Sequence, residues 1–179
     1  MSDEAMSWTD RYALIQNSNG VRFINQAYQR SFSFNLFQMN AVALTDAIQR
    51  AHDVDQGIIW MSEAHRDAGQ QAHRELHRHI HNFVASALTL VEHTRIFMRV
   101  NYANSSLMRE YETHAKATFA SSPTAQFIQG LRNYFLHKGM PNTSMYLHYE
   151  KNPGSDSTGG SMNTGVQMDA QALLERDGW

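Results

Sequence analysis

The feature that most constrains this chain is a long, unbroken helical periodicity that runs from about Asp67 to Asn101. Apolar residues recur there at about 100° per residue, which is the rotation between successive residues of an α-helix. They are Ala72, Leu76, Ile80, Phe83, Val84, Ala87, Leu90, Val91 and Met98. A helix with such a stripe must bury it against other elements, so we expect a mainly α-helical protein built as a helical bundle.

Three shorter segments show the same spacing and are predicted to be helices, at about 34–50, 105–120 and 122–139. The last has the clearest limits. Ser122 can cap a helix and Pro123 suits its first turn, whereas Gly139 and Pro141 end it. Its predicted buried stripe consists of Phe127, Ile128, Leu131, Tyr134 and Phe135.

The character of the chain changes after Pro141. Aromatic and β-branched residues at 143–149 favour a strand, and after a turn-rich loop, 161–168 is the predicted returning strand of a hairpin. Residues 169–175 resemble the start of another helix, and Leu173 and Leu174 so near Trp179 fit a chain that continues. We therefore divide the chain into an N-terminal segment (1–33, with a turn at 17–20), a helical bundle (34–140) and a hairpin with C-terminal extension (141–179).

The composition excludes several classes of protein and several kinds of functional site. Apolar residues make up 42% and charged residues 18%, which is typical of a globular protein. No cysteine is present, so disulfides, thiol catalysis and thiolate metal sites are excluded. The net charge of -2 argues against a general polyanion binder. Because no secretory signal or transmembrane run is apparent, we expect a soluble, cytoplasmic protein with no membrane partner.

The helix predicted at 122–139 carries polar chemistry on the side away from its apolar stripe. With Leu131 at zero, Arg132, Asn133 and His137 fall at about 100°, 200° and 240°. Leu136 falls among them at about 140°. An apolar residue on this polar side indicates contact with another segment or with a second copy of the chain.

This Arg-Asn-x-x-x-His pattern, formed by Arg132, Asn133 and His137, resembles the signature of the HEPN superfamily (higher eukaryotes and prokaryotes nucleotide-binding domain). The resemblance covers the motif and the helical body at 34–139, so the hairpin would be an addition. It implies a helical bundle with the motif on a late helix, and a metal-independent endoribonuclease that acts as a dimer. It also implies RNA as substrate, no cofactor, and a setting in toxin–antitoxin or phage-defence systems with an antitoxin or defence partner.

The resemblance assigns catalytic roles that suit the residue types. An imidazole exchanges protons near neutral pH, so His137 would be the general base or acid that acts on the 2′-hydroxyl. Arg132, a permanent forked cation, would stabilise charge on the phosphate. Asn133 would orient the site or bind phosphate. Lys138 would add a phosphate contact, although an ordinary surface lysine at a helix end explains it equally simply. Arg132 and His137 lie about 140° apart on one helix. We therefore expect a homodimer with a composite cleft and Leu136 near its interface.

Two alternatives to a catalytic site stay open, namely a chance occurrence of the motif and a non-catalytic binding module. The same Arg–His spacing occurs at Arg74–His79 and Arg109–His114, so spacing alone carries little information. A non-catalytic helical module that binds a nucleotide or a partner protein through the same face would show the same residues.

A stripe of histidines, His73, His77 and His81, lies at i, i+4 and i+8. An i, i+4 histidine pair can bind Zn²⁺ or Ni²⁺. The residues interleaved with them, Arg74, Glu75 and Arg78, are typical of an ordinary polar helix flank, and we favour that interpretation.

Overall fold

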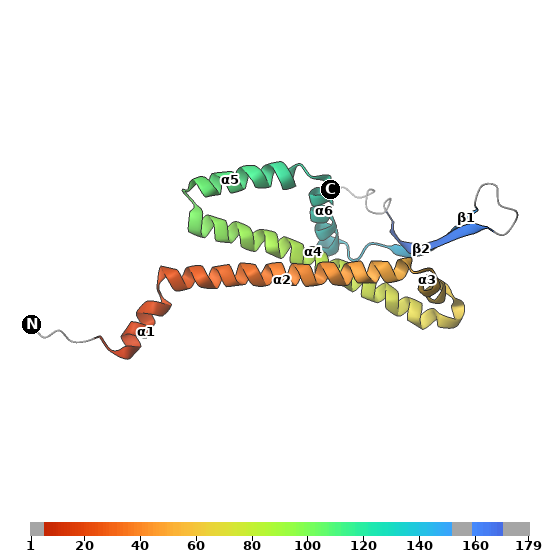
Figure 1. Cartoon of the computed structure of the whole chain (residues 1–179), viewed down its shortest axis with the longest axis horizontal. Helices are drawn as coiled ribbons and strands as arrows, with labels where there is room; N and C mark the ends of the chain where they lie inside the picture. Colours follow the sequence, from red (N-terminus) through yellow and green to blue (C-terminus); the bar gives the residue numbers. More distant parts are fainter. Residues whose placement is uncertain (1–5, 152–158, 170–179) are drawn as a thin grey trace, which may run out of the picture.

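The computed structural model describes residues 6–151 and 159–169. Within them, six α-helices precede one antiparallel hairpin, which confirms the mainly α-helical class (Figure 1). The helices are α1 (Trp8–Gln16), α2 (Asn19–His52), α3 (Val54–Met61), α4 (Arg66–Tyr102), α5 (Ser106–Ala115) and α6 (Pro123–His137). A 3₁₀ turn (Glu63–His65) precedes α4, and a π-helical turn (Lys116–Ala120) follows α5. The strands are β1 (Thr143–Lys151) and β2 (Gly160–Met168).

The two long helices α2 and α4 form the antiparallel spine of the molecule (Figure 1). Polar contacts fix their register. Ser33 of α2 is buried and lies 2.6 Å from Nδ1 of His93 in α4. Farther along, the Asn101 amide donates to Gln26 Oε1 at 2.8 Å. The beginning of α2 therefore pairs with the end of α4.

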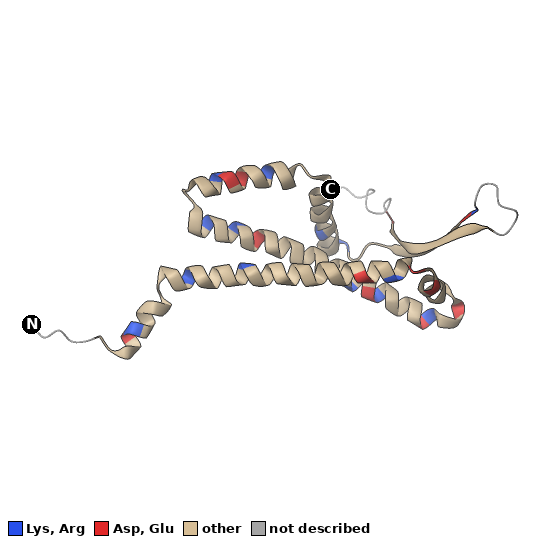
Figure 2. Ribbon diagram, viewed as in Figure 1, with Lys and Arg blue, Asp and Glu red and all other residues tan. Residues whose placement is uncertain are grey.

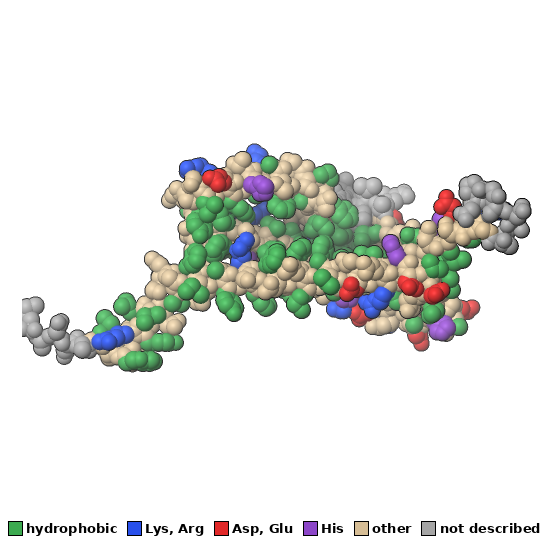
Figure 3. All heavy atoms as spheres, in the orientation of Figure 1, with side chains coloured by type: hydrophobic (Ala, Val, Ile, Leu, Met, Phe, Trp, Pro, Cys, Tyr) green, Lys and Arg blue, Asp and Glu red, His purple; other side chains and the backbone are tan. Residues whose placement is uncertain are grey.

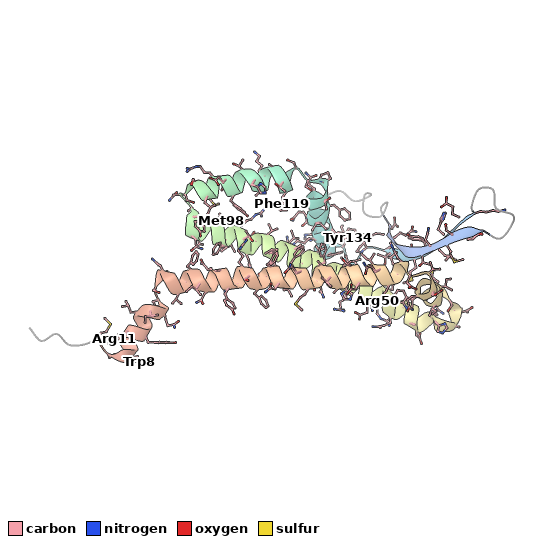
Figure 4. The ribbon with its side chains drawn as sticks, viewed as in Figure 1. Trp8, Arg11, Arg50, Met98, Phe119 and Tyr134 are labelled. Carbon is pink, nitrogen blue, oxygen red and sulfur yellow. The ribbon has the colours of Figure 1, made fainter. Side chains whose placement is uncertain are left out.

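The central core lies where α6 crosses α4. Val84 of α4 and Leu131 of α6 are almost fully buried there. Partly buried side chains surround them, namely Ile80, Phe83, Leu88, Ile128, Tyr134, Phe135 and Met168. Tyr134 marks this junction in Figure 4. The predicted buried stripe of α6 is thus confirmed except at Phe127, which is 44% exposed.

The helices predicted at 67–101, 105–120 and 122–139 are confirmed, but the one predicted from Phe34 begins much earlier. The α2 helix starts at Asn19, where Ser18 Oγ accepts a hydrogen bond from the Val21 amide at 3.2 Å. The turn expected at 17–20 is thus limited to the α1–α2 junction, and Gly20 already lies inside the helix. The short helix α3 was not predicted. The helix expected at 169–175 falls outside the described residues, apart from Asp169.

The predicted hairpin is confirmed, with Thr143 opposite Met168 and Lys151 opposite Gly160. It packs against α3 and the end of α2. Thr164 of β2 is buried there, and its hydroxyl donates to the Ala51 carbonyl oxygen at 2.9 Å. That contact satisfies a backbone acceptor at the end of α2, where no further helical turn can do so.

Length alone does not make the long helices membrane spans. Although α2 and α4 have 34 and 37 residues, no helix in the described part of the chain is apolar enough over a sufficient length to cross a membrane.

Candidate functional site on helix α6

The sequence of α6 sets sharp limits on both of its ends. Ser122 caps the start with its hydroxyl, and Pro123 occupies the first turn. At the other end, the Lys138 amide donates to the Tyr134 carbonyl oxygen at 2.8 Å. Gly139 then takes a left-handed conformation with φ of 98°, which glycine adopts without strain. The helix therefore stops directly after His137, which leaves that side chain at the helix terminus.

The inner face of α6 holds the helix against α4. Leu131 is 3% exposed and packs against Val84. One turn later, the Phe135 ring lies 5.8 Å from the His81 ring, measured between centroids. These contacts fix the rotation of α6 about its axis, so the opposite side of the helix must face outward.

The motif residues occupy that outward side. Arg132, Asn133 and His137 are exposed, as is Lys138 just after the helix. Leu136 is 62% exposed among them, although it is a large apolar residue. Arg132 and His137 point about 140° apart, so a single copy does not bring them together. Within the described residues, neither Arg132 nor Lys138 takes part in an ion pair.

Helix α6 itself carries basic but no acidic residues. The stretch 113–149, which includes all of α6, contains no Asp or Glu. In Figure 2 the α6 ribbon accordingly carries the colour of basic residues but not that of acidic residues. The carbonyl end of a helix attracts cations and repels phosphate. Any phosphate bound near His137 would therefore depend on basic side chains, of which Lys138 is the nearest in sequence, and not on the helix terminus.

The pair Arg74–His79 has the motif spacing but not this environment. The Arg74 guanidinium donates to the Gln71 amide oxygen at 3.0 Å. The His79 side chain is only 12% exposed, and its Nδ1 is buried without a partner among the described residues. Burial, and then the Arg78 guanidinium, lower the pKa of His79. This imidazole is neutral at physiological pH and is not accessible to a large substrate.

The pair Arg109–His114 is exposed on α5 and is the closest match to the motif in its setting. Both residues line a shallow surface hollow of about 470 Å³, and Glu110 lines it with them. Glu112 is also on this helix and is exposed. Two carboxylates on this helix oppose the approach of a phosphodiester, and α6 has none.

The histidine stripe of α4 connects this helix to the hairpin and to α6. Nε2 of His73 and Nε2 of His77 lie 2.5 and 2.7 Å from the Thr143 hydroxyl oxygen in β1. His81 instead contacts Phe135. Burial, together with the His73 imidazole, lowers the pKa of His77. Within the described residues, no three His, Asp or Glu side chains gather as a set that could hold a metal ion.

A hollow that the sequence did not predict lies between α3, the start of α4 and β1. It has a volume of about 470 Å³, and its lining includes Trp60, Glu63, Arg66 and His73. No motif residue of α6 contributes to it. Most of the lining comes from residues 60–73, and Met145 of β1 completes it from far along the sequence.

Comparisons with protein-family models, with curated proteins and with solved structures find no match for this chain. The α6 face is therefore interpreted from its own residues, exposure and charge.

Proposed function

We propose that this protein is a metal-independent endoribonuclease of the HEPN type, with Arg132, Asn133 and His137 as its catalytic residues. One observation carries the proposal. Of the three Arg–His pairs with this spacing, only that of α6 combines two exposed side chains, no ion pair among the described residues and a helix free of acidic side chains. These are the properties that an RNA-cleaving face needs.

The proposed chemistry uses RNA's own 2′-hydroxyl as the nucleophile. The His137 imidazole removes the 2′-hydroxyl proton, and the 2′-oxygen bonds to the adjacent phosphorus. The bond from phosphorus to the 5′-oxygen breaks, that oxygen takes up a proton from water, and the protonated His137 releases its proton to water. The products are a 2′,3′-cyclic phosphate and a 5′-hydroxyl. Arg132 donates to the phosphate oxygens as negative charge gathers on them.

The proposal includes a homodimer because one copy supplies only part of this geometry. Arg132 and His137 lie about 140° apart on α6. A second α6 across a two-fold axis would place its His137 beside the first copy's Arg132, so that each cleft takes one of these residues from each copy. Leu136, at 62% exposure between them, would be buried at such an interface. Asn133 and Lys138 then line the cleft and bind the RNA backbone.

The biological setting is proposed from the family resemblance alone and is an analogy. On that basis the substrate is cellular or phage RNA, and the partner is an antitoxin or another defence protein.

The test is RNA cleavage by untagged protein in EDTA, with a panel of structured and unstructured RNAs. His137→Ala and Arg132→Ala are expected to lower the rate at least about 100-fold, because each removes a catalytic group. His114→Ala and Arg109→Ala are matched controls, since α5 presents the same pair in exposed positions. Both controls should cleave at the wild-type rate.

Two results would contradict the proposal. Cleavage that survives in His137→Ala and Arg132→Ala would place the activity elsewhere. Wild-type protein that binds RNA or nucleotides but cleaves none of the panel would favour the non-catalytic binding module.

A further inference from the structure

Helix α2 has a second apolar face, which no part of the described chain covers. Its members are Tyr28, Phe32, Asn35, Met39 and Val42, which we call the α2 seam. Tyr28 is 78% exposed, Met39 70%, Phe32 65% and Val42 61%. A contiguous row of apolar side chains this large and this exposed is uncommon on a monomeric protein. Figure 3 shows hydrophobic side chains along the edge of α2 that faces away from α5.

The seam is distinct from the face that α2 uses inside the molecule. At about 100° per residue, all five members fall within about 80° of one another. Ser33 and Phe37, which contact α4, lie about 140° and 180° from the centre of the seam. A helix that is apolar on opposite sides is one that is normally buried on both.

The spacing of the seam is that of a coiled coil. Its members follow one another at alternating steps of four and three residues, as a and d positions of a heptad do. A partner helix packed along it would contact residues 28–42, a length of roughly 21 Å.

The absence of charge indicates what that partner is. Between Phe23 and Thr45 the only charged residue is Arg30. Its guanidinium lies 5.9 Å from the centre of the Phe97 ring of α4, on the other side of the helix. Nothing on the seam therefore selects a charged partner, and two identical seams can meet without repulsion.

Asn35, the one polar member, points to the same partner. A side-chain amide is both donor and acceptor, so it can pair with the same amide of a second copy. A single buried asparagine in an apolar seam commonly fixes the register of such a pair.

The available area is sufficient for a dimer. Ile24 and Leu36 flank the seam and are 61% and 38% exposed. With them, six apolar side chains offer on the order of 600 Å² per copy, or about 1,200 Å² in a pair. We infer that two copies of this chain pair α2 to α2 through the seam, about a two-fold axis at Asn35.

This pairing is separate from the dimer of the proposed function. The α6 motif lies on a helix that packs against α4, whereas the seam faces away from α4. A copy bound at the seam leaves the α6 face open. A protein that uses both surfaces assembles beyond a dimer, and each interface can be disrupted without the other.

The test uses the absence of cysteine from the natural chain. Asn35→Cys introduces a single thiol at the centre of the seam. Mild oxidation is expected to convert most of the protein into a covalent dimer on a denaturing, non-reducing gel. Gln71→Cys is the matched control, because Gln71 is an exposed polar residue on α4, and it should remain largely monomeric on that gel.

A second variant shows whether the seam itself is responsible. Adding Met39→Glu to Asn35→Cys should reduce cross-linking at least about tenfold, because it places two unpaired carboxylates in the interface. Circular dichroism verifies that the helices remain, since Met39 is exposed in the single chain. The inference is overturned if Asn35→Cys does not cross-link, if Gln71→Cys cross-links equally, or if Met39→Glu has no effect.

Discussion

At the scale of single residues, Thr143 connects the helical body to the hairpin. Its hydroxyl is shared by His73 and His77, which lie 70 and 66 residues earlier in the sequence. A hydroxyl can donate to only one imidazole, and a protonated imidazole cannot accept. The Thr143 hydroxyl can therefore donate to one ring and accept from the other.

This arrangement predicts that stability falls in mild acid. The pKa values of His77 and His79 are lowered from 6.5 in the folded protein, so below that pH the unfolded chain binds protons more readily. The stabilising contribution is complete above about pH 6.5 and is lost as the pH falls toward the lowered values. Thermal unfolding at about pH 7.5 and about pH 5.5 should show a lower midpoint in acid.

His77→Gln should weaken this pH dependence, whereas His148→Gln, on the exposed part of β1, should leave it unchanged. A midpoint that is constant or higher in acid would contradict the assigned role of these histidines.

The residues of the α6 face could be predicted from the sequence, but the surroundings of Thr143 could not. The outward direction of Arg132, Asn133 and His137 follows from one helix with one apolar stripe, and the structure confirms their exposure. The contacts of Thr143 join segments that are far apart in sequence, so no local pattern encodes them.

At the scale of elements, helices with one apolar face were predicted well and the helix with two was not. Helices α4 and α6 each present a single stripe, and their predicted bounds are confirmed within a few residues. In α2, Tyr28 and Phe32 lie on one side while Phe23 contacts Phe97 of α4 on another. Apolar residues on two sides weaken the helical period. The first half of α2 therefore falls in the N-terminal segment (1–33), where the sequence predicts no helix.

The contact between α3 and α4 provides a prediction about packing. A Cβ added at Gly69 would overlap the backbone carbonyl oxygen of Trp60, which cannot move aside as a side chain can. Gly69→Ala is expected to lower the free energy of unfolding by about 2 kcal/mol or more. Urea denaturation measures the change.

Gly20→Ala is the matched control. Gly20 is also helical, but the nearest atom to its added Cβ is Ser18 Oγ at 3.8 Å. This change should be neutral or stabilise the protein by up to about 1 kcal/mol. Equal effects of the two substitutions would mean that α3 does not pack on Gly69 as described.

At the scale of the whole molecule, the buried core is small for the length of the helices. Among the described residues, the buried apolar side chains are Ala47, Ala51, Leu76, Val84, Met98, Leu131 and Pro141. Many large apolar side chains remain exposed, on α1 and α2 in particular. The exposed ring of Trp8, for example, stacks only on Tyr12 of the same helix, away from the other helices (Figure 4). Helical periodicity predicted the class of fold, but it could not reveal how much apolar surface the fold leaves uncovered.

A composite active site predicts that two inactive variants restore each other. In a mixed dimer of Arg132→Ala and His137→Ala, one of the two clefts receives Arg132 and His137 from the copies that retain them. If subunits mix at random, about a quarter of the wild-type activity should return. Cleavage by each variant alone and by the refolded mixture measures this. A mixture as inactive as its components would show that each copy builds its site alone.

The most direct test of the central claim is the chemical identity of the cleaved ends. Wild-type protein incubated with RNA in EDTA should yield 2′,3′-cyclic phosphate and 5′-hydroxyl ends, identified by mass spectrometry, and His137→Ala should yield neither. Those ends would show attack by the 2′-hydroxyl, with the His137 imidazole as the group that moves its proton. Ends that carry a 5′-phosphate and a 3′-hydroxyl, or cyclic ends that persist in His137→Ala, would contradict the account.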